Sequence, residues 1–334
     1  MNRPTSLLIV AFAAVYVIWG STYLAIKVGL ESLPPFLLMG VRSALAGAVL
    51  YGWARARGAP APDAAHWWTG ASIGVLLFVG GHGGLAWSQQ RVPSGVASLV
   101  VATIPIWMTL IDWRRTGGAA PSARVWLGLA LGLAGVGLLT EPYDVLGGAP
   151  VDSAGVAVLV GASIAWAIGS VHAKHARLPG SAALTAGMGL LAGGAGLLTL
   201  AVLTGQIASL PHISARSAAA LAYLIIPGSI VAFVAYVWLL KVTTPTRVST
   251  YAYVNPVVAL TLGWLLGGEA LSPRVLAAAA LMLTGVAAIV ARPPRRAGTV
   301  DRSKQDAACV AAVERRATAA SSSSAAPTRR SPSS

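Results

Sequence analysis

Ten mostly apolar runs follow one another along the chain, each bounded by charged residues, prolines or turn-forming clusters. A helix of about 20 residues is long enough to cross the hydrocarbon layer of a bilayer, which is about 30 Å thick. The first run contains Trp19 and precedes nine others, which is not the pattern of a cleaved signal peptide. We therefore expect an all-α integral membrane protein with ten transmembrane helices, at residues 7–27, 34–53, 67–88, 95–113, 124–141, 153–173, 181–204, 217–240, 247–267 and 274–291.

The composition excludes the main alternatives to a membrane protein. Only 10% of the 334 residues are charged, whereas soluble domains carry charge on about 25% of theirs. The 37 glycines and 20 prolines are spread among apolar runs, which is unlike a disordered chain. The single cysteine, Cys309, excludes a disulfide framework and a zinc site built on paired thiolates.

Positive charge indicates how the chain is oriented, because Lys and Arg in short loops are retained on the cytoplasmic side. With the N-terminus inside, cytoplasmic segments hold thirteen Lys and Arg residues and the outer loops hold three. We therefore expect both termini in the cytoplasm. The net charge of +14 is then explained by loops, and nucleic acid is not an expected partner. The three outer residues are Arg91, Arg216 and Arg274.

The last part of the chain differs from the rest. After Arg296 the sequence becomes rich in Ser and Ala and ends in SSSSAAPTRRSPSS, a composition that cannot form a core. We expect residues 1–6 to be a cytoplasmic N-terminus and residues 292–334 to be a disordered basic tail. Binding of a partner or of anionic lipid is the alternative role for the tail.

Residues recur between the two halves of the apolar region. Trp19 and Lys27 recur at an offset of 147 as Trp166 and Lys174. At an offset of 151, Trp87, Ser98, Pro105 and Trp113 recur as Trp238, Ser249, Pro256 and Trp264. Because each half holds an odd number of spans, corresponding helices must cross the membrane in opposite directions. We expect two inverted five-helix repeats, at residues 7–141 and 153–291, around a central cavity, as in carriers that work by alternating access.

Four runs carry a resemblance to a known family: YVIWGSTYLAIKVGLESLPPFLLMGVRSALAG, GGHGGLAWSQQRVPSGVASLVVATIPIW, VWLGLALGLAGVGLL and TRVSTYAYVNPVVALTLGWLLGGEALSP. They resemble the EamA family of the drug/metabolite transporter superfamily, closest to its YedA-like subgroup, over about residues 7–291. The resemblance implies movement of small metabolites or drugs, commonly outward, across the plasma membrane of a bacterium. Members often carry a Glu-Arg pair after a helix turn; here Glu269 is followed by Ala270, and Gly117-Gly118 stands in the first half.

The expected function is a secondary transporter, and an exporter, whose partners are the lipid bilayer and a small molecule such as an amino acid, another metabolite or a drug. An intramembrane enzyme and a membrane scaffold without transport are the alternatives. No HExxH motif occurs, and the one GxSxG match, GASIG at residues 70–74, lies within an apolar span and not at the strand-to-helix elbow that this motif needs, so we expect no enzyme, no cofactor and no metal. Substrate, direction, coupling ion and assembly into a homodimer stay open.

Two polar residues stand out inside the spans. Arg42 lies well within the second run without a nearby acid. An intramembrane Arg faces the bundle interior or a wet cavity, where it either holds helix-end carbonyls or attracts an anionic or zwitterionic substrate. His82, within GGHGG, is either a packed histidine or a switch and substrate donor.

Other candidates combine aromatic rings, hydroxyls and prolines. Trp19 and Trp166 occupy matching positions and, with Ser21 and Thr22, either pack helices or line the cavity. Pro105 and Pro256 each remove a helical hydrogen bond and predict kinks. We expect Lys27 and Lys174, near span ends, to reach the membrane interface. The full predicted substrate path is Trp19, Ser21, Thr22, Arg42, His82, Ser98, Trp166, Tyr251, Tyr253 and Asn255.

Overall fold

A computed structural model describes residues 5–117, 120–140, 151–208, 212–242 and 251–290. The described residues all belong to one compact unit. The predicted tail and the predicted cytoplasmic N-terminus up to residue 4 lie outside the described residues, as does the connection at 141–150. Throughout the described ranges the regular structure is helical, and no strand occurs there.

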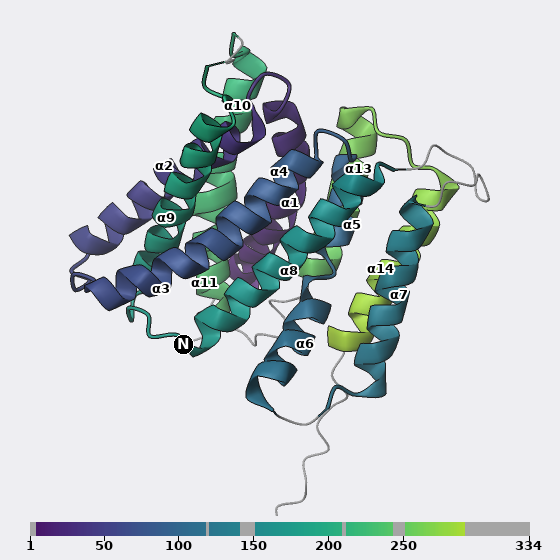
Figure 1. The fold of residues 1–334 in the computed structure, drawn as a ribbon, viewed down its shortest axis with the longest axis horizontal. Helices are drawn as coiled ribbons and strands as arrows, with labels where there is room; N and C mark the ends of the chain where they lie inside the picture. The colour runs from purple at the N-terminus through teal and green to yellow at the C-terminus, as the bar shows by residue number, and fades with distance from the viewer. Residues whose placement is uncertain (1–4, 118–119, 141–150, 209–211, 243–250, 291–334) are drawn as a thin grey trace, which may run out of the picture. The chain divides into compact units, whose positions relative to one another are not determined.

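Helices follow one another in an order that matches the apolar runs (Figure 1). The first half contains α1 (Thr5–Gly29), α2 (Pro35–Ala56), α3 (Ala64–Gly74), η1 (Val75–Gly83), α4 (Gly84–Ser88), α5 (Ser94–Val101), α6 (Ile104–Thr116) and α7 (Ala123–Thr140). The second half contains α8 (Ser153–His175), α9 (Ala182–Leu203), α10 (Ala215–Tyr223), η2 (Leu224–Val231), α11 (Ala232–Val242), α13 (Tyr251–Gly267) and α14 (Pro273–Val290).

Helix boundaries follow from local chemistry. The side chains of Asp152, Ser181 and Ser214 accept hydrogen bonds from main-chain amides in the first turns of α8, α9 and α10, which satisfies donors left free at a helix start. Gly117 ends α6 with a φ of 62°, in the left-handed region that glycine adopts without strain. These caps place the turns between the apolar runs.

Seven helices of the described chain are long and apolar enough to cross a membrane. Three shorter apolar helices, at Ala123–Leu139, Val254–Gly267 and Pro273–Ala288, occupy the other positions where spans are expected. Large apolar side chains stay exposed along several spans, as at Ile9 and Val10 of α1 and Leu203 of α9. Such exposure is costly in water and is what a lipid-facing surface requires. The chain is therefore a helical membrane protein.

Helices from the two halves pack side by side. The most extensive contacts join α2 to α9 and α7 to α14, and α1 packs along α13. Glycines allow the closest approaches: a Cβ added to Gly194 would lie 2.6 Å from the amide nitrogen of Ala44. Small residues at helix interfaces are how membrane helices approach closely.

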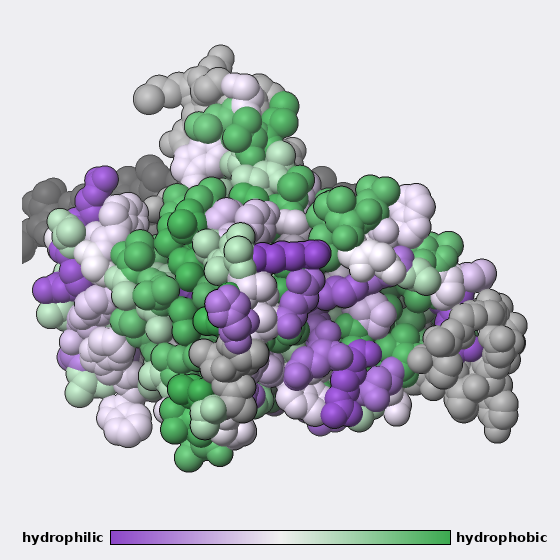
Figure 2. Space-filling model, turned by 90° about the horizontal axis from the view of Figure 1, so that it is seen from above, coloured by the Kyte–Doolittle hydropathy of each residue, from purple (hydrophilic) through white to green (hydrophobic). Residues whose placement is uncertain are grey.

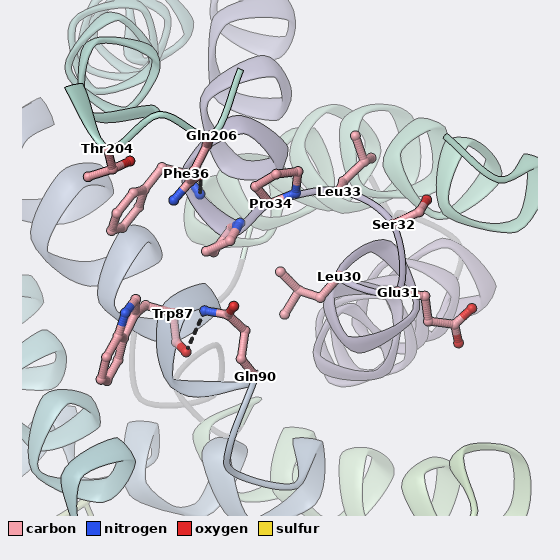
Figure 3. Close-up of a pocket in the computed structure, with 11 residues that line it drawn as sticks. Leu30, Glu31, Ser32, Leu33, Pro34, Phe36, Trp87, Gln90, Thr204 and Gln206 are labelled. Atoms are coloured by element: carbon pink, nitrogen blue, oxygen red, sulfur yellow. Dashed lines mark hydrogen bonds between the residues drawn. The ribbon is translucent and has the colours of Figure 1, made fainter. Parts of the chain in front are cut away.

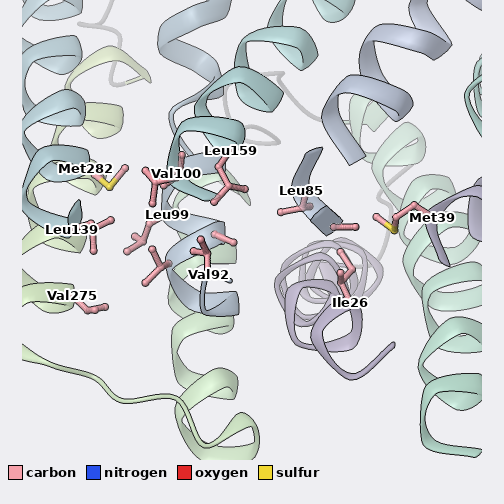
Figure 4. Packing of buried hydrophobic residues seen from close by; sticks show 14 of the residues in the cluster. Ile26, Met39, Leu85, Val92, Leu99, Val100, Leu139, Leu159, Val275 and Met282 are labelled. Carbon is pink, nitrogen blue, oxygen red and sulfur yellow. The ribbon is translucent and has the colours of Figure 1, made fainter. Parts of the chain in front are cut away.

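The largest buried cluster joins both halves of the chain (Figure 4). Ile26 and Met39 contribute from α1 and α2, Leu99 from α5, and Leu159 and Met282 from α8 and α14. All five are at most 1% exposed. Because residues from the two halves share one cluster, neither half can bury this surface by itself.

The hydrophilic residues gather at the helix ends. Figure 2 looks onto the end where α1 stops and α5 begins, and it shows hydrophilic side chains beside broad hydrophobic areas. The pocket and the ion pair that are described next lie at this end.

Candidate functional site

A pocket of about 440 Å³ opens between the connection from α1 to α2, the end of α4 and the end of α9 (Figure 3). Its volume lies within the range of small-ligand sites. The pocket is lined by Leu30, Glu31, Ser32, Leu33, Pro34, Pro35, Phe36, Trp87, Gln90, Thr204 and Gln206. The predicted substrate-path residues do not line it, so the sequence analysis missed this site.

Two glutamines fix the walls of the pocket. The Gln206 Oε1 accepts hydrogen bonds from the amides of Phe36 at 3.1 Å and Leu37 at 3.4 Å, and thereby caps the first turn of α2. Gln90 Nε2 donates to the carbonyl oxygen of Trp87 at 3.1 Å (Figure 3). The rings of Phe36 and Trp87 stand on one side in this view. The pocket therefore offers aromatic faces with neutral amide groups beside them.

Arg42 is buried in the middle of α2. It is 6% exposed, and its Nε donates to Ser229 Oγ in η2 at 3.0 Å. One terminal nitrogen, Nη1, contacts Met39 Sδ at 3.9 Å. Tyr23 and His82 are close enough to interact with it electrostatically. Among the described residues no carboxylate forms an ion pair with Arg42, so a buried cation is held only by neutral groups.

Two spans contain a π-helical segment, η1 and η2, where a regular α-helix would be expected. Such segments are rare and occur frequently at functional sites. His82 lies in η1, with its ring 5.2 Å from the rings of both Phe78 and Trp166. Its Nδ1 is enclosed without a hydrogen-bond partner in the part of the chain that is described.

The second π segment is contacted by α1. Trp19 Nε1 donates to the carbonyl oxygen of Gly228 in η2 at 3.1 Å, and its ring lies 5.3 Å from Tyr236 and 5.1 Å from Tyr251. Ser21 Oγ lies 2.7 Å from the Tyr223 hydroxyl. Thr22 Oγ1 donates to the Trp19 carbonyl oxygen at 2.6 Å and so bonds within its own helix.

The remaining predicted residues are placed as follows. Ser98 is buried and donates to the Gly95 carbonyl oxygen at 2.6 Å. In the orientation that satisfies both partners, the Asn255 amide nitrogen lies 3.3 Å from the Tyr16 carbonyl oxygen and 3.2 Å from that of Tyr251. Nothing is described of the Tyr253 side chain.

The two candidate prolines differ in their placement. Pro105 stands in the first turn of α6, just after the break between α5 and α6. Pro256 lies inside α13. The kinks predicted at Pro105 and Pro256 stay predictions.

The candidates thus form two groups. Trp19, Ser21, Arg42 and Tyr251 gather around η2 and the residues beside it, whereas Trp166 joins His82 at η1. The electrostatic proximity of Arg42 and His82 connects the groups. In the described residues, no three His, Cys, Asp or Glu side chains come together as metal ligands would.

Glu269 has contacts that the sequence did not predict. Its carboxylate accepts hydrogen bonds from the amides of Ser94 at 2.7 Å and Gly95 at 3.1 Å, at the start of α5, and pairs with Lys27 Nζ at 3.0 Å. Burial alone would raise the pKa of this carboxyl, but the bonds from Gly95, Ser94 and Lys27 hold the pKa below its ordinary value. In the sequence Glu269 stood out as the acid of a Glu-Arg pair typical of the resembled family, but nothing there indicated its partners.

A profile of the EamA-like transporter family matches residues 6–140 and, separately, residues 153–291. The uncharacterized inner membrane transporter YedA of Escherichia coli K12 is 39% identical over 264 residues, which cover 78% of this chain and 83% of that protein. A probable amino-acid metabolite efflux pump of the same strain is 28% identical over 280 residues, covering 81% of this chain and 91% of the pump.

One solved crystal structure resembles the fold. It matches 85% of this chain and 97% of its own chain, with a TM-score of 0.57 and 26% sequence identity. The likeness therefore extends over nearly the whole described unit.

Proposed function

Because the chain belongs to the EamA-like transporter family, we propose that it is a secondary transporter that exports a small metabolite or drug by alternating access. The two separate matches to the family profile are the observation on which the proposal rests. Export is favoured because a relative that spans most of the chain is named as an efflux pump. The membership fits a transporter better than an enzyme.

The proposed architecture is ten transmembrane helices in two inverted repeats. It is supported by matched features on both sides of the chain, namely a Trp and a Lys on α1 and on α8 and one π segment in each half. The opposite directions of α1 and α8 also support it, since Lys27 contacts the start of the span Ser94–Thr116 through Glu269 and Lys174 contacts its end. We place the chain in the bacterial plasma membrane with both termini in the cytoplasm, from the distribution of Lys and Arg.

The proposed substrate path begins at the pocket and continues toward the π segments. Phe36, which lines the pocket, would lie 3.7 Å from a Cβ at Gly83, the last residue of η1. His82 and Trp166 are the next aromatic rings along that route. Arg42 and the residues around η2 form its second part.

We assign the substrate to small molecules that carry a carboxylate. The Arg42 guanidinium has five N–H donors, and its hydrogen bonds to the described residues use one donor on a hydroxyl and one on a thioether. A buried cation without a counter-ion is costly, and a carboxylate would supply the missing charge. The name of one relative, an amino-acid metabolite pump, is compatible with this chemistry.

The experiment compares acids with their amides in proteoliposomes. We expect amino acids to compete for transport and the corresponding carboxamides to compete at least about tenfold less well, since a buried charge-assisted bond is lost. Arg42→Gln should abolish the difference. Arg55→Gln, on the same helix but exposed and bonded to the Ala59 carbonyl oxygen, is the matched control. Equal competition by acids and amides would overturn the substrate class, and the absence of substrate-dependent flux would overturn the transporter.

A further inference from the structure

Two lysines at corresponding positions each bind a carboxylate from a distant part of the chain. Lys27, in the last turn of α1, lies 3.0 Å from Glu269 Oε1. Lys174, in the last turn of α8, lies 2.8 Å from Asp112 Oδ2 in α6. The two lysines were expected only to reach the membrane interface. In both cases the structure gives them a partner.

The two ion pairs lie at opposite ends of one span. Glu269 binds the amide of Ser94, where the span Ser94–Thr116 begins, whereas Asp112 lies in the last turns of the same span. At about 1.5 Å per residue, α5 and α6 together separate them by roughly 27 Å along the span. The two ion pairs therefore lie at opposite ends of the helix bundle, one toward each side of the membrane.

Each pair also connects the two halves of the chain. Lys27 belongs to the first half and Glu269 to the second, whereas Lys174 belongs to the second half and Asp112 to the first. A movement that separates the halves at one end must break the pair at that end. The pair at the other end can stay intact during this movement.

The pairs differ in burial and in the number of bonds that hold them. The Glu269 side chain is 7% exposed and accepts two further bonds from Ser94 and Gly95, while Lys27 also donates to the Gly267 carbonyl oxygen at 2.9 Å. Lys174 is 61% exposed and Asp112 is 32% exposed. His175 Nε2 lies 3.8 Å from Asp112 Oδ1. Exposed pairs contribute little, whereas losing one partner of a buried pair leaves an uncompensated charge.

We infer that Lys27–Glu269 and Lys174–Asp112 are the two end latches of the transport cycle, and that their unequal strength keeps the empty carrier closed at the Glu269 end. Opening at the Asp112 end breaks only an exposed pair. Opening at the Glu269 end breaks a pair whose carboxylate is 7% exposed and whose lysine is 37% exposed, together with the bonds of that carboxylate to the start of α5. This inference rests on the proposed transport function, because a latch has no role in a static scaffold. It adds four charged residues to those that control transport.

The test uses matched substitutions and two thiol reporters. Cys309→Ser removes the single natural cysteine, and Ser98→Cys or Ser170→Cys then places one thiol near each end. Ser98 is 1% exposed on α5, and Ser170 lies one turn before Lys174 on α8. The rate at which a charged methanethiosulfonate reagent converts each thiol to a mixed disulfide, with release of methanesulfinate, is measured in nanodiscs, where both faces are accessible.

Lys27→Gln should raise the modification rate at Ser98→Cys about tenfold or more, because the latched state loses population. Lys174→Gln should change the rate at Ser170→Cys by less than about threefold, because its pair is exposed. Lys27→Arg, which retains the charge, should restore the low rate at Ser98→Cys. This rescue separates the latch from a general loss of folding.

Equal increases from the two glutamine variants, or no increase from Lys27→Gln in a folded protein, would overturn the inference. Flux of the wild-type protein is measured in parallel. If flux is present and the rates do not change, the latch fails and the transporter stands. If no tested solute produces flux, the proposed function fails whatever the thiols report.

Discussion

Gly47 on α2 and Gly187 on α9 lie so close that a Cβ added to Gly47 would stand 3.0 Å from the carbonyl oxygen of Gly187. The same Cβ would stand 2.7 Å from the amide nitrogen of Leu191. Both obstacles are main-chain atoms, which cannot rotate away. The contact between α2 and α9, one from each half, therefore depends on the absence of a side chain.

Gly47→Ala should lower the melting temperature of the purified protein, because overpacking of a close contact costs about 1–3 kcal/mol. Gly52→Ala is the control on the same helix, since nothing lies within 4 Å of its added Cβ. It should leave the melting temperature unchanged or raise it, because alanine favours a helix by up to about 1 kcal/mol over glycine. A similar loss in both variants would contradict the packing described for α2 and α9.

Acid should weaken the fold through Glu269. Its pKa is lowered in the folded protein, so its deprotonated form stabilises folding above the ordinary pKa. That stability is lost as the pH falls through the folded value. The difference in melting temperature between wild type and Glu269→Gln should therefore be largest near pH 7 and shrink on acidification. Glu31→Gln, at an exposed carboxylate 3.5 Å from Arg216, should show a small difference at every pH.

His82→Phe separates stability from transport. Because Nδ1 of His82 is enclosed without a described partner, its replacement removes a burial cost of about 1–3 kcal/mol. The variant should unfold at the wild-type temperature or above it and lose most of its flux. His172→Phe, at a histidine whose Nε2 lies 3.3 Å from Ser72 Oγ, is the control that should retain flux. Wild-type flux in His82→Phe would limit that residue to packing.

Trp19→Phe should affect the protein more than Trp166→Phe. The first substitution removes the donor to the Gly228 carbonyl oxygen in η2, whose loss costs about 1 kcal/mol. Trp166 contributes its ring to His82 and Phe78, and its indole nitrogen has no hydrogen bond to the described residues. Melting temperature and flux of both variants are the measurements. Equal effects would show that ring packing alone matters at these positions.

The positions of the spans could be predicted because a bilayer imposes a length on every apolar helix. The run expected at 7–27 is α1, Thr5–Gly29, and the run expected at 34–53 is α2, Pro35–Ala56. The division of the fourth span into α5 and α6 lies at Ala102 and Thr103, just before Pro105, so the sequence contains a signal for it. The π segments were not predicted, although Pro227 stands inside η2 and a proline removes a helical hydrogen bond.

The contacts of the charged residues could not be predicted from the sequence. Lys27 and Lys174 stand where span ends usually place long cations, and their partners Glu269 and Asp112 are distant in the chain. Only packing of the two halves brings them together. The pocket was missed for a related reason, because its walls come from connections and helix ends such as Gln90 and Gln206. Arg42 could be identified because a charged side chain inside a membrane span is energetically costly and usually marks a functional site.

The π segment η1 also sets the rotational phase of its span. An α-helix turns by about 100° per residue, so one residue more or less in a helix rotates everything beyond it by that angle. Trp87 follows η1 and lines the pocket, while His82 within η1 meets Trp166. Deleting one residue from Val75–Gly83 would keep the span helical and apolar, yet it would turn Trp87 toward another neighbour. The span thus tolerates changes of residue type more readily than changes of residue number.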